Sequence, residues 1–189
     1  RIMFGGKSGR LPSAMKHDFS NVPKAHIPRS KFDRSFTWKG TFDAGYLIPI
    51  FCDEAVPGDT MSLNMSHFAR FSTLIKPVMD NLYVDFQFWA VPKRLLWTNF
   101  EKFMGAQDDP GDSIDFLVPQ VQTPAGGPAV GSLVDFMGLP TAGQITGANQ
   151  YYFNAWWTRA YNFIWNQCYR DENLQDSVVV DKDDGPDTY

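Results

Sequence analysis

The sequence predicts a mainly β protein with inserted helices, and three observations support this fold class. Short segments in which apolar and polar residues alternate recur between residues 32 and 91, a pattern typical of half-buried strands. Glycine, proline and aspartate separate these segments in the manner of tight turns. One later segment, residues 154–171, instead repeats its apolar side chains at helical spacing.

Four strands are expected in the first half of the chain. They cover residues 32–38, 46–52, 61–66 and 83–91. Pro49 suits an edge strand or a bulge, because proline cannot donate to a ladder. Between the second and third strands, Pro57 presets its own φ and Gly58 admits a positive φ, so a turn that includes Asp59 is expected.

Helices and loops are expected in the second half. Residues 93–103 favour a short amphipathic helix ended by a glycine. A long loop over residues 105–131 is rich in Asp, Gly and Pro and leaves room for a brief strand within residues 116–121. A second short helix is expected to begin after Ser132 and to end at Met137.

The long helix has two chemically different faces. Its apolar face carries Phe153, Trp156, Trp157, Ala160, Tyr161, Ile164 and Cys168. Its polar face carries Arg159, Asn162, Asn166 and Arg170. Trp, Tyr and Asn are mediocre helix formers, so the helix must be stabilised by packing, and Trp165 is expected as a core aromatic. The polar face suits phosphate or a neighbouring subunit, but hydrogen bonding to buried carbonyls and carboxylates is the expected use.

The two cysteines are expected to be reduced core thiols. Cys52 lies in a predicted strand and Cys168 on the apolar face of the helix. Such thiols fit a protein made in a reducing cytoplasm.

Charge is segregated along the chain. The net charge is −4, but residues 1–40 carry +7 and residues 41–189 carry −11. Residues 1–31 have little apolar periodicity and predict an extended basic arm. The cations expected to face a polyanion are Lys7, Arg10, Lys16, Lys24, Arg29, Lys31 and Arg34. Single-stranded nucleic acid is one expected partner; a solvated tail or an arm draped over a neighbouring subunit is an equal alternative.

Nothing in the sequence predicts an enzyme or a bound cofactor. The three histidines, His17, His26 and His67, have no second ligand at metal-binding spacing. Asp181, Asp183 and Asp184 resemble a calcium loop in composition but are too closely spaced, so weak cation binding stays open. No apolar run approaches the roughly 20 residues needed to cross a bilayer, and no membrane partner is expected.

Several blocks resemble one known family, the major capsid proteins of the microviruses, and most closely their gokushovirus branch. The blocks are residues 27–32 (IPRSKF), 47–50 (LIPI), 53–60 (DEAVPGDT), 77–81 (PVMDN), 91–97 (VPKRLLW), 159–162 (RAYN), 164–166 (IWN) and 170–176 (RDENLQD). They stand in the family's order. The matching residues expected to act in structure or assembly are Pro57, Gly58, Asp59, Arg94, Trp97, Arg159, Tyr161, Asn162, Trp165, Asn166 and Arg170.

The resemblance implies a viral single jelly roll, with residues 32–92 as its first strands and residues 93–189 as a helical and loop insertion. It also implies that the chain is the N-terminal portion of a longer protein and depends on absent segments to close its core. The expected role is a structural protein of a small icosahedral shell around single-stranded DNA, assembled in the bacterial cytoplasm. The expected partners are further copies of the protein, the missing C-terminal portion, viral DNA and a small basic DNA-packaging protein.

Two other functions fit parts of the sequence. A carbohydrate-binding β-sandwich would use exposed aromatics such as Trp89 or Trp157, but it leaves the basic arm unexplained. A cellular single-stranded DNA-binding protein would combine a basic groove with stacking aromatics, and the acidic body disfavours it.

Overall fold

The computed structural model of this chain describes residues 26–113 and 115–188. The chain divides into two compact units, Arg1–Thr37 and Trp38–Tyr189. In the first unit, the described residues 26–37 form neither helix nor strand. Their local order includes the Asp33 carboxylate, which accepts hydrogen bonds from the backbone N–H and the hydroxyl of Ser35.

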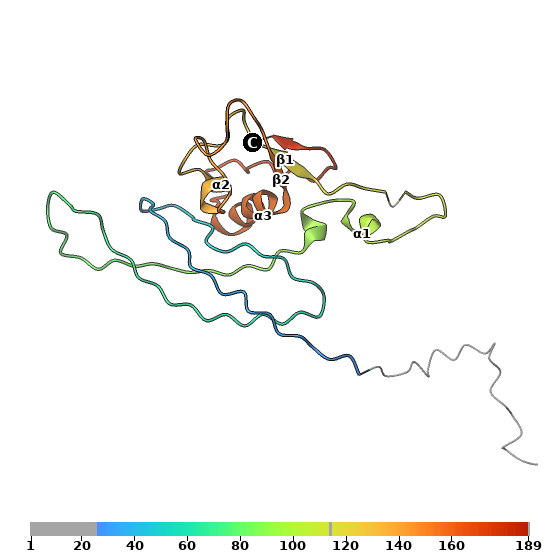
Figure 1. Cartoon of the computed structure of the whole chain (residues 1–189), viewed down its shortest axis with the longest axis horizontal. Coiled ribbons are helices and arrows are strands. Elements are labelled where there is room, and N and C mark those ends of the chain that lie inside the picture. The colour runs from blue at the N-terminus through green and yellow to red at the C-terminus, as the bar shows by residue number, and fades with distance from the viewer. Residues whose placement is uncertain (1–25, 114, 189) are drawn as a thin grey trace, which may run out of the picture. The chain divides into compact units, whose positions relative to one another are not determined.

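The regular structure of the second unit begins after residue 92. The elements are η2 (Lys93–Leu95), α1 (Phe100–Phe103), β1 (Gln120–Gln122), α2 (Leu133–Phe136), β2 (Tyr152–Asn154), α3 (Trp156–Ile164), a π-helical turn (Trp165–Tyr169) and β3 (Asp187–Thr188). The three strands form one sheet in the order β2-β1-β3, close to α3 (Figure 1). β1 pairs antiparallel with β2 and parallel with β3, with Val121 opposite both Phe153 and Asp187.

The core of this unit is aromatic. Leu96, Trp97 and Trp156 form the buried cluster, and Trp97 is 0% exposed. The Trp97 ring lies 5.3 Å from that of Phe103 and 6.4 Å from that of Phe116, and Phe100 bridges it to Trp156. Aromatic pairs at these separations add to the stabilisation that burial gives. The short helices at 93–103 are therefore held by the buried Leu96 and Trp97 between them and by the partly buried Phe100 and Phe103.

The helix predicted over 154–171 is present, with different ends and a different winding. Asn154 belongs to β2, and its side-chain oxygen accepts the Trp156 N–H at 2.8 Å at the start of α3. Arg170 is extended, which ends the helix. From Trp165 onward the helix is a π-helix, in which each residue turns through fewer degrees than in an α-helix. The apolar face, which was assigned at about 100° per residue, therefore does not continue past this point. Cys168 is consequently exposed and Trp165 half-buried, so the predictions of a core thiol and a core aromatic at these positions were wrong.

The other short elements were predicted in part. The helix expected after Ser132 is present as α2, whereas the helix predicted over 93–103 is divided into the 3-10 turn η2 and the short α1; Gly105 and Gly138 have the positive φ of helix ends. Ser132 precedes α2 but its side chain makes no cap bond. The brief strand lies at 120–122, later than expected within 116–121, because its register is set by pairing with β2. The sequence did not predict β2 or β3.

The four strands predicted between residues 32 and 91 form no ladder. The described residues 26–92 contain no helix or strand, and Figure 1 draws them as plain coil. Many apolar side chains here are exposed, among them Phe32, Phe68 and Met79 at 80%, 89% and 99%. A strand needs a neighbour that satisfies its backbone, and no described segment of this chain pairs with these residues. The apolar and polar residues alternate as in a strand, but no partner strand for these segments is found in the described chain.

Candidate functional site

The most buried charged group of the described chain is the Arg159 guanidinium, which is 2% exposed. Its Nε and Nη2 donate to the two carboxylate oxygens of Asp187 at 2.9 and 2.6 Å. Nη1 donates to the Leu96 carbonyl at 3.1 Å, and both terminal nitrogens donate to the Asp183 carbonyl at 3.2 Å. Planar, charge-assisted bonds of this kind are the strong ones. The structure therefore confirms, for Arg159, the predicted use of the polar face.

A second set of bonds fixes the same C-terminal loop, residues 181–188, which we call the anchor loop. The Trp97 indole N–H donates to Asp184 Oδ1 at 2.5 Å, and the Asn99 amide donates to Asp184 Oδ2 at 2.8 Å. The Thr98 N–H donates to the Lys182 carbonyl at 3.0 Å. Together with Arg159, these bonds join the anchor loop to α3 and to the Trp97 region. They place β3 where it can pair with β1.

Two of the three aspartates that resemble a calcium loop, Asp181 and Asp183, converge here with Asp187, whereas Asp184 binds Trp97 and Asn99. One carboxylate oxygen each from Asp181, Asp183 and Asp187 lies within 4.8 Å of the others. Asp187 is already bound by Arg159, and Asp183 Oδ1 accepts the Gly185 N–H at 2.8 Å. The loop's conformation is thus explained by its own bonds, and weak cation binding stays a prediction.

The rest of the polar face also binds backbone. Asn166 Nδ2 donates to the Val178 carbonyl at 2.7 Å, and Asn166 Oδ1 accepts the Val178 N–H at 2.9 Å. A neighbouring β-strand would satisfy the Val178 backbone with the same two bonds. Arg170 Nη1 donates to the Gln175 carbonyl at 2.9 Å. Asn162 is half-buried. These contacts hold the chain that leaves the helix along its own surface.

One cluster was missed by the sequence reasoning. Lys93 Nζ lies 2.5 Å from Glu54 Oε2 and 3.6 Å from the centre of the Trp156 ring. The Asn154 amide donates to Glu54 Oε1 at 3.2 Å. Glu54 and Lys93 both stand in the recognised sequence blocks, but no pattern in those blocks indicates that they pair. The cluster ties the extended segment around Glu54 to the start of α3.

The predicted turn at residues 56–59 is confirmed. The Asp59 N–H donates to the Val56 carbonyl at 3.0 Å, and Asp59 Oδ2 accepts the Val56 N–H at 3.0 Å. Gly58 has φ +92°, which an L side chain rarely adopts. Pro57, Gly58 and Asp59 therefore form a local structural motif, whereas Arg94 is an exposed side chain of η2.

The predicted basic arm is described only at its end. Arg29, Lys31 and Arg34 are exposed in the first unit. Lys7, Arg10, Lys16 and Lys24 lie outside the described residues. Whether the seven cations form one site therefore stays a prediction.

The aspartate-rich loop after α1 is held by one carboxylate. Asp112 Oδ2 accepts the N–H groups of Asp108 and Asp109 at 3.2 and 3.3 Å and lies 3.7 Å from Lys102 Nζ. The carboxylate thus satisfies two backbone donors at the turn.

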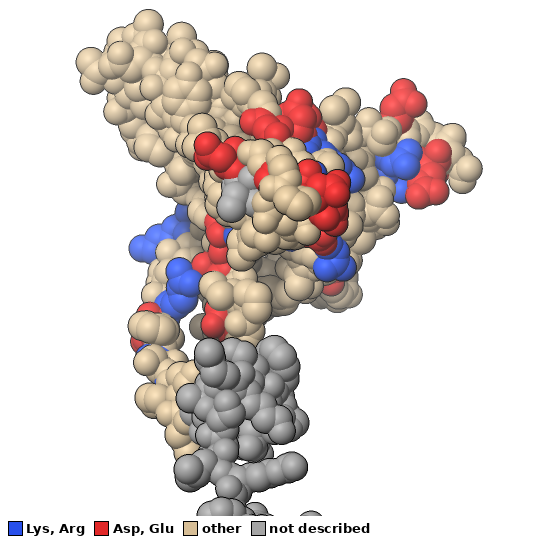
Figure 2. Space-filling view, turned by 90° about the vertical axis from the view of Figure 1, so that its right-hand side faces the viewer, with Lys and Arg blue, Asp and Glu red and all other residues tan. Residues whose placement is uncertain are grey.

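Acidic side chains gather on the face shown in Figure 2, with a few Lys and Arg among them.

These contacts predict a titration. The backbone N–H groups of Asp109 and Asp108, and to a smaller extent Lys102, lower the pKa of Asp112 from its ordinary 3.8. Because the folded pKa is depressed, the loop contacts are fully present above pH 3.8 and are lost as the pH falls through the lower folded value. We expect an NMR titration of the Asp112 carboxyl to show a midpoint below 3.8. Lys102→Met should move it little, and a midpoint at or above 3.8 would contradict the contacts.

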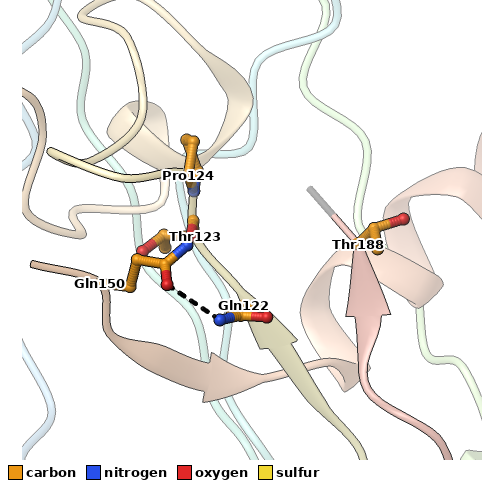
Figure 3. Close-up of a pocket in the computed structure, with 5 residues that line it drawn as sticks. All are labelled: Gln122, Thr123, Pro124, Gln150 and Thr188. Atoms are coloured by element: carbon orange, nitrogen blue, oxygen red, sulfur yellow. Dashed lines mark hydrogen bonds between the residues drawn. The ribbon is translucent and has the colours of Figure 1, made fainter. Parts of the chain in front are cut away.

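A shallow pocket of about 200 Å³ lies at the end of β1 and β3. It is lined by Gln122, Thr123, Pro124, Gln150 and Thr188 (Figure 3). The Gln122 amide donates to Gln150 Oε1 at 3.0 Å, and Gln150 donates to the Thr123 carbonyl at 3.0 Å. None of the five side chains titrates near neutral pH, so the lining supplies no general acid or base.

The contacts described here stabilise the fold. The buried charge binds backbone carbonyls and a carboxylate, and the pocket at the end of β1 and β3 is lined by amides, hydroxyls and a proline. Both thiols, Cys52 and Cys168, are free. Across residues 26–113 and 115–188, no helix is long and apolar enough to cross a membrane.

The chain belongs to the phage capsid protein family described as "Capsid protein (F protein)", which matches residues 20–188. It is 47% identical over 180 residues to "Capsid protein VP1" of Chlamydia phage 1, covering 92% of this chain and 29% of that protein. It is 47% identical over 174 residues to "Capsid protein VP1" of Bdellovibrio phage phiMH2K, covering 92% of this chain and 32% of that protein. "Capsid protein VP1" of Spiroplasma virus 4 is 34% identical over 172 residues, and the match covers 90% of this chain and 30% of that protein.

These matches confirm the resemblance to the microvirus capsid proteins that the sequence blocks indicated. The chain spans 29% to 32% of the length of the curated relatives it matches.

Proposed function

We propose that the chain is part of a shell-forming subunit of a small single-stranded DNA phage. The observation that carries the proposal is the family match over residues 20–188, together with three relatives named as capsid proteins. The role is structural, and its mechanism is association of many copies through interfaces related by symmetry. A carbohydrate-binding module has no comparable support, since Trp157 is half-buried and Trp89 packs edge-on against Tyr169.

The exposed apolar side chains of the extended region support this proposal. Residues that alternate as strands, such as Leu63 and Phe88, are 56% and 54% exposed. Apolar surface and unpaired strand edges on this scale are typical of segments that bind other strands. We therefore propose that residues 32–92 supply the first strands of a jelly roll and that further segments of the capsid protein complete it.

The anchor loop and the Arg159 network support the second part of the proposal. They give residues 93–188 a core of their own, built on Trp97 and Arg159. In the proposed subunit, this part is a rigid helical and loop insertion from which the strand region extends. Inserted loops of this kind build shell contacts in jelly-roll capsid proteins, as the resemblance implies.

Cryo-electron microscopy of the protein at its relatives' full length tests the proposal. We expect uniform icosahedral particles in which this chain's density joins a closed jelly roll in the virion shell. Dispersed monomers with a complete fold would contradict it. The same reconstruction would show whether a small basic packaging protein accompanies the DNA. Particles accumulating in the cytoplasm of the producing bacterium would locate assembly there.

We also propose that the basic arm faces the genome. The charge of +7 over residues 1–40 supports this, because lysine and arginine release counterions when they neutralise phosphates. Replacing Lys7, Arg10 and Lys16 by glutamine should lower the packaged DNA per particle more than the yield of particles. The measurement is the ratio of DNA to protein in purified particles.

The matched control neutralises three exposed cations of the body, Arg70, Lys76 and Lys182, which removes the same charge. It should leave DNA content per particle closer to that of the parent. Equal DNA content in the arm variant and the parent would count against a genome-facing arm. It would favour an arm that contacts a neighbouring subunit.

A further inference from the structure

The helix formed by α3 and its π-helical turn carries two tyrosines that bind distant segments. The Tyr161 hydroxyl donates to the Leu47 carbonyl at 2.9 Å across 114 residues of sequence. The Tyr169 hydroxyl donates to the side-chain oxygen of Gln87 across 82 residues. The Trp89 ring packs edge-on against the Tyr169 ring, with centroids 6.3 Å apart. One helix therefore contacts two segments of the extended region.

The π-helical turn brings the two hydroxyls toward one side of the helix. In a regular α-helix at about 100° per residue, side chains eight positions apart point about 80° away from each other. Trp165–Tyr169 winds as a π-helix, which turns through fewer degrees per residue and reduces that divergence. Burial, and then the nearby Tyr169, raises the pKa of Tyr161, as expected if the two rings share a side.

The two segments so held have the composition of strands but no strand partners among residues 26–113 and 115–188. Leu47 lies in the apolar run 46–52, and Gln87 lies in the alternating run 83–91. The Tyr161 bond uses the Leu47 backbone carbonyl and therefore does not depend on the Leu47 side chain. The first segment has a second attachment, because Glu54 is bound by Lys93 and Asn154.

We propose that this helix is a positioning template: Tyr161 and Tyr169 fix segments 46–54 and 83–91 beside it at a set spacing. The identity of the strands that would pair with these segments rests on the proposed function. The positioning of the segments by the two tyrosines is a property of this chain alone. A hydroxyl bond at one point in each segment fixes its position along the helix. Errors of strand register are costly in sheets, because a slip of one residue moves every side chain of the strand to the opposite face of the sheet.

Distance measurements on the unassembled chain test this template. The parent carries Cys52→Ser and Cys168→Ser, with spin labels on exposed positions changed to cysteine: Val130 in the folded part, Val56 beside the first segment and Tyr83 in the second. Their exposures are 74%, 66% and 79%. Pulsed electron double resonance should give a narrow distance peak from position 130 to each segment.

Each attachment should then fail separately. Tyr161→Phe combined with Glu54→Gln should abolish the narrow peak to position 56 and keep that to position 83. Tyr169→Phe should do the reverse. Tyr152→Phe is the control, because Tyr152 is 55% exposed and lies on β2, and both peaks should persist.

Three outcomes would overturn the template. They are broad distributions in the parent, unchanged peaks in both variants, and loss of both peaks together in either variant, which would indicate general loosening. Because no particles are involved, a failure here is separate from a failure to form a shell.

Discussion

Replacing Arg159 by methionine should destabilise residues 93–188 by about 3–5 kcal/mol, the cost typical of removing one partner from a buried ion pair. The guanidinium is 2% exposed, so water cannot take its place beside the Asp187 carboxylate and the carbonyls of Leu96 and Asp183. The anchor loop should detach, and β3 should leave β1 with it. Urea unfolding followed by tryptophan fluorescence measures the loss.

Two variants sharpen this expectation. Adding Asp187→Leu to Arg159→Met should recover part of the loss, because the second change removes the buried unpaired charge. Arg94→Met is the matched control, since Arg94 is exposed and a surface change of this kind usually stays within about 0.5 kcal/mol. A loss below about 1 kcal/mol for Arg159→Met would mean that the network does not hold the loop.

Truncating Trp97 to alanine should cost a similar amount, about 3–5 kcal/mol, because it leaves a cavity where the largest buried side chain stood. The ring is 0% exposed and touches Phe100, Phe103 and Phe116. Its indole N–H also donates to Asp184 at 2.5 Å, so the anchor loop loses a bond as well. Equilibrium unfolding in urea gives the free energy.

The comparison with Trp165 makes the test specific. Trp165 is half-buried and outside the Leu96, Trp97 and Trp156 cluster, so Trp165→Ala should cost clearly less than Trp97→Ala. Trp97→Phe should fall between the parent and Trp97→Ala, since it keeps an aromatic ring and loses the bond to Asp184. Equal losses at positions 97 and 165 would show that burial of the ring does not set the cost.

Local patterns correctly predicted local structure. The spacing of Trp156, Trp157, Ala160 and Ile164 indicated the helix, and the Pro57-Gly58 pair indicated its turn, because both depend on residues within a few positions of each other. The polar face was expected to bind carbonyls and carboxylates, and Arg159 does so. The sequence could not name Asp187, Leu96 and Asp183 as the partners.

Where the prediction was wrong, a distant contact or a change of winding was responsible. Cys168 is exposed because the helix becomes π-helical from Trp165, which no composition rule shows. The strands expected at 32–91 are extended but unpaired, since alternation indicates a strand while pairing needs a second one. β3 is only two residues long and exists where the anchor loop lies against β1.

The sequence by itself determined the family, the long helix, the turn at Gly58 and the segregation of charge, because each is written in residues that are close together or in ordered blocks. The tertiary structure alone decided that Arg159 is the anchor, that Trp97 and not Trp165 is the central aromatic, and that Tyr161 and Tyr169 bind two distant segments. These contacts include bonds between residues 63, 82 and 114 positions apart. Burial and pairing at such separations depend on how the chain packs, and packing is a property of the whole fold.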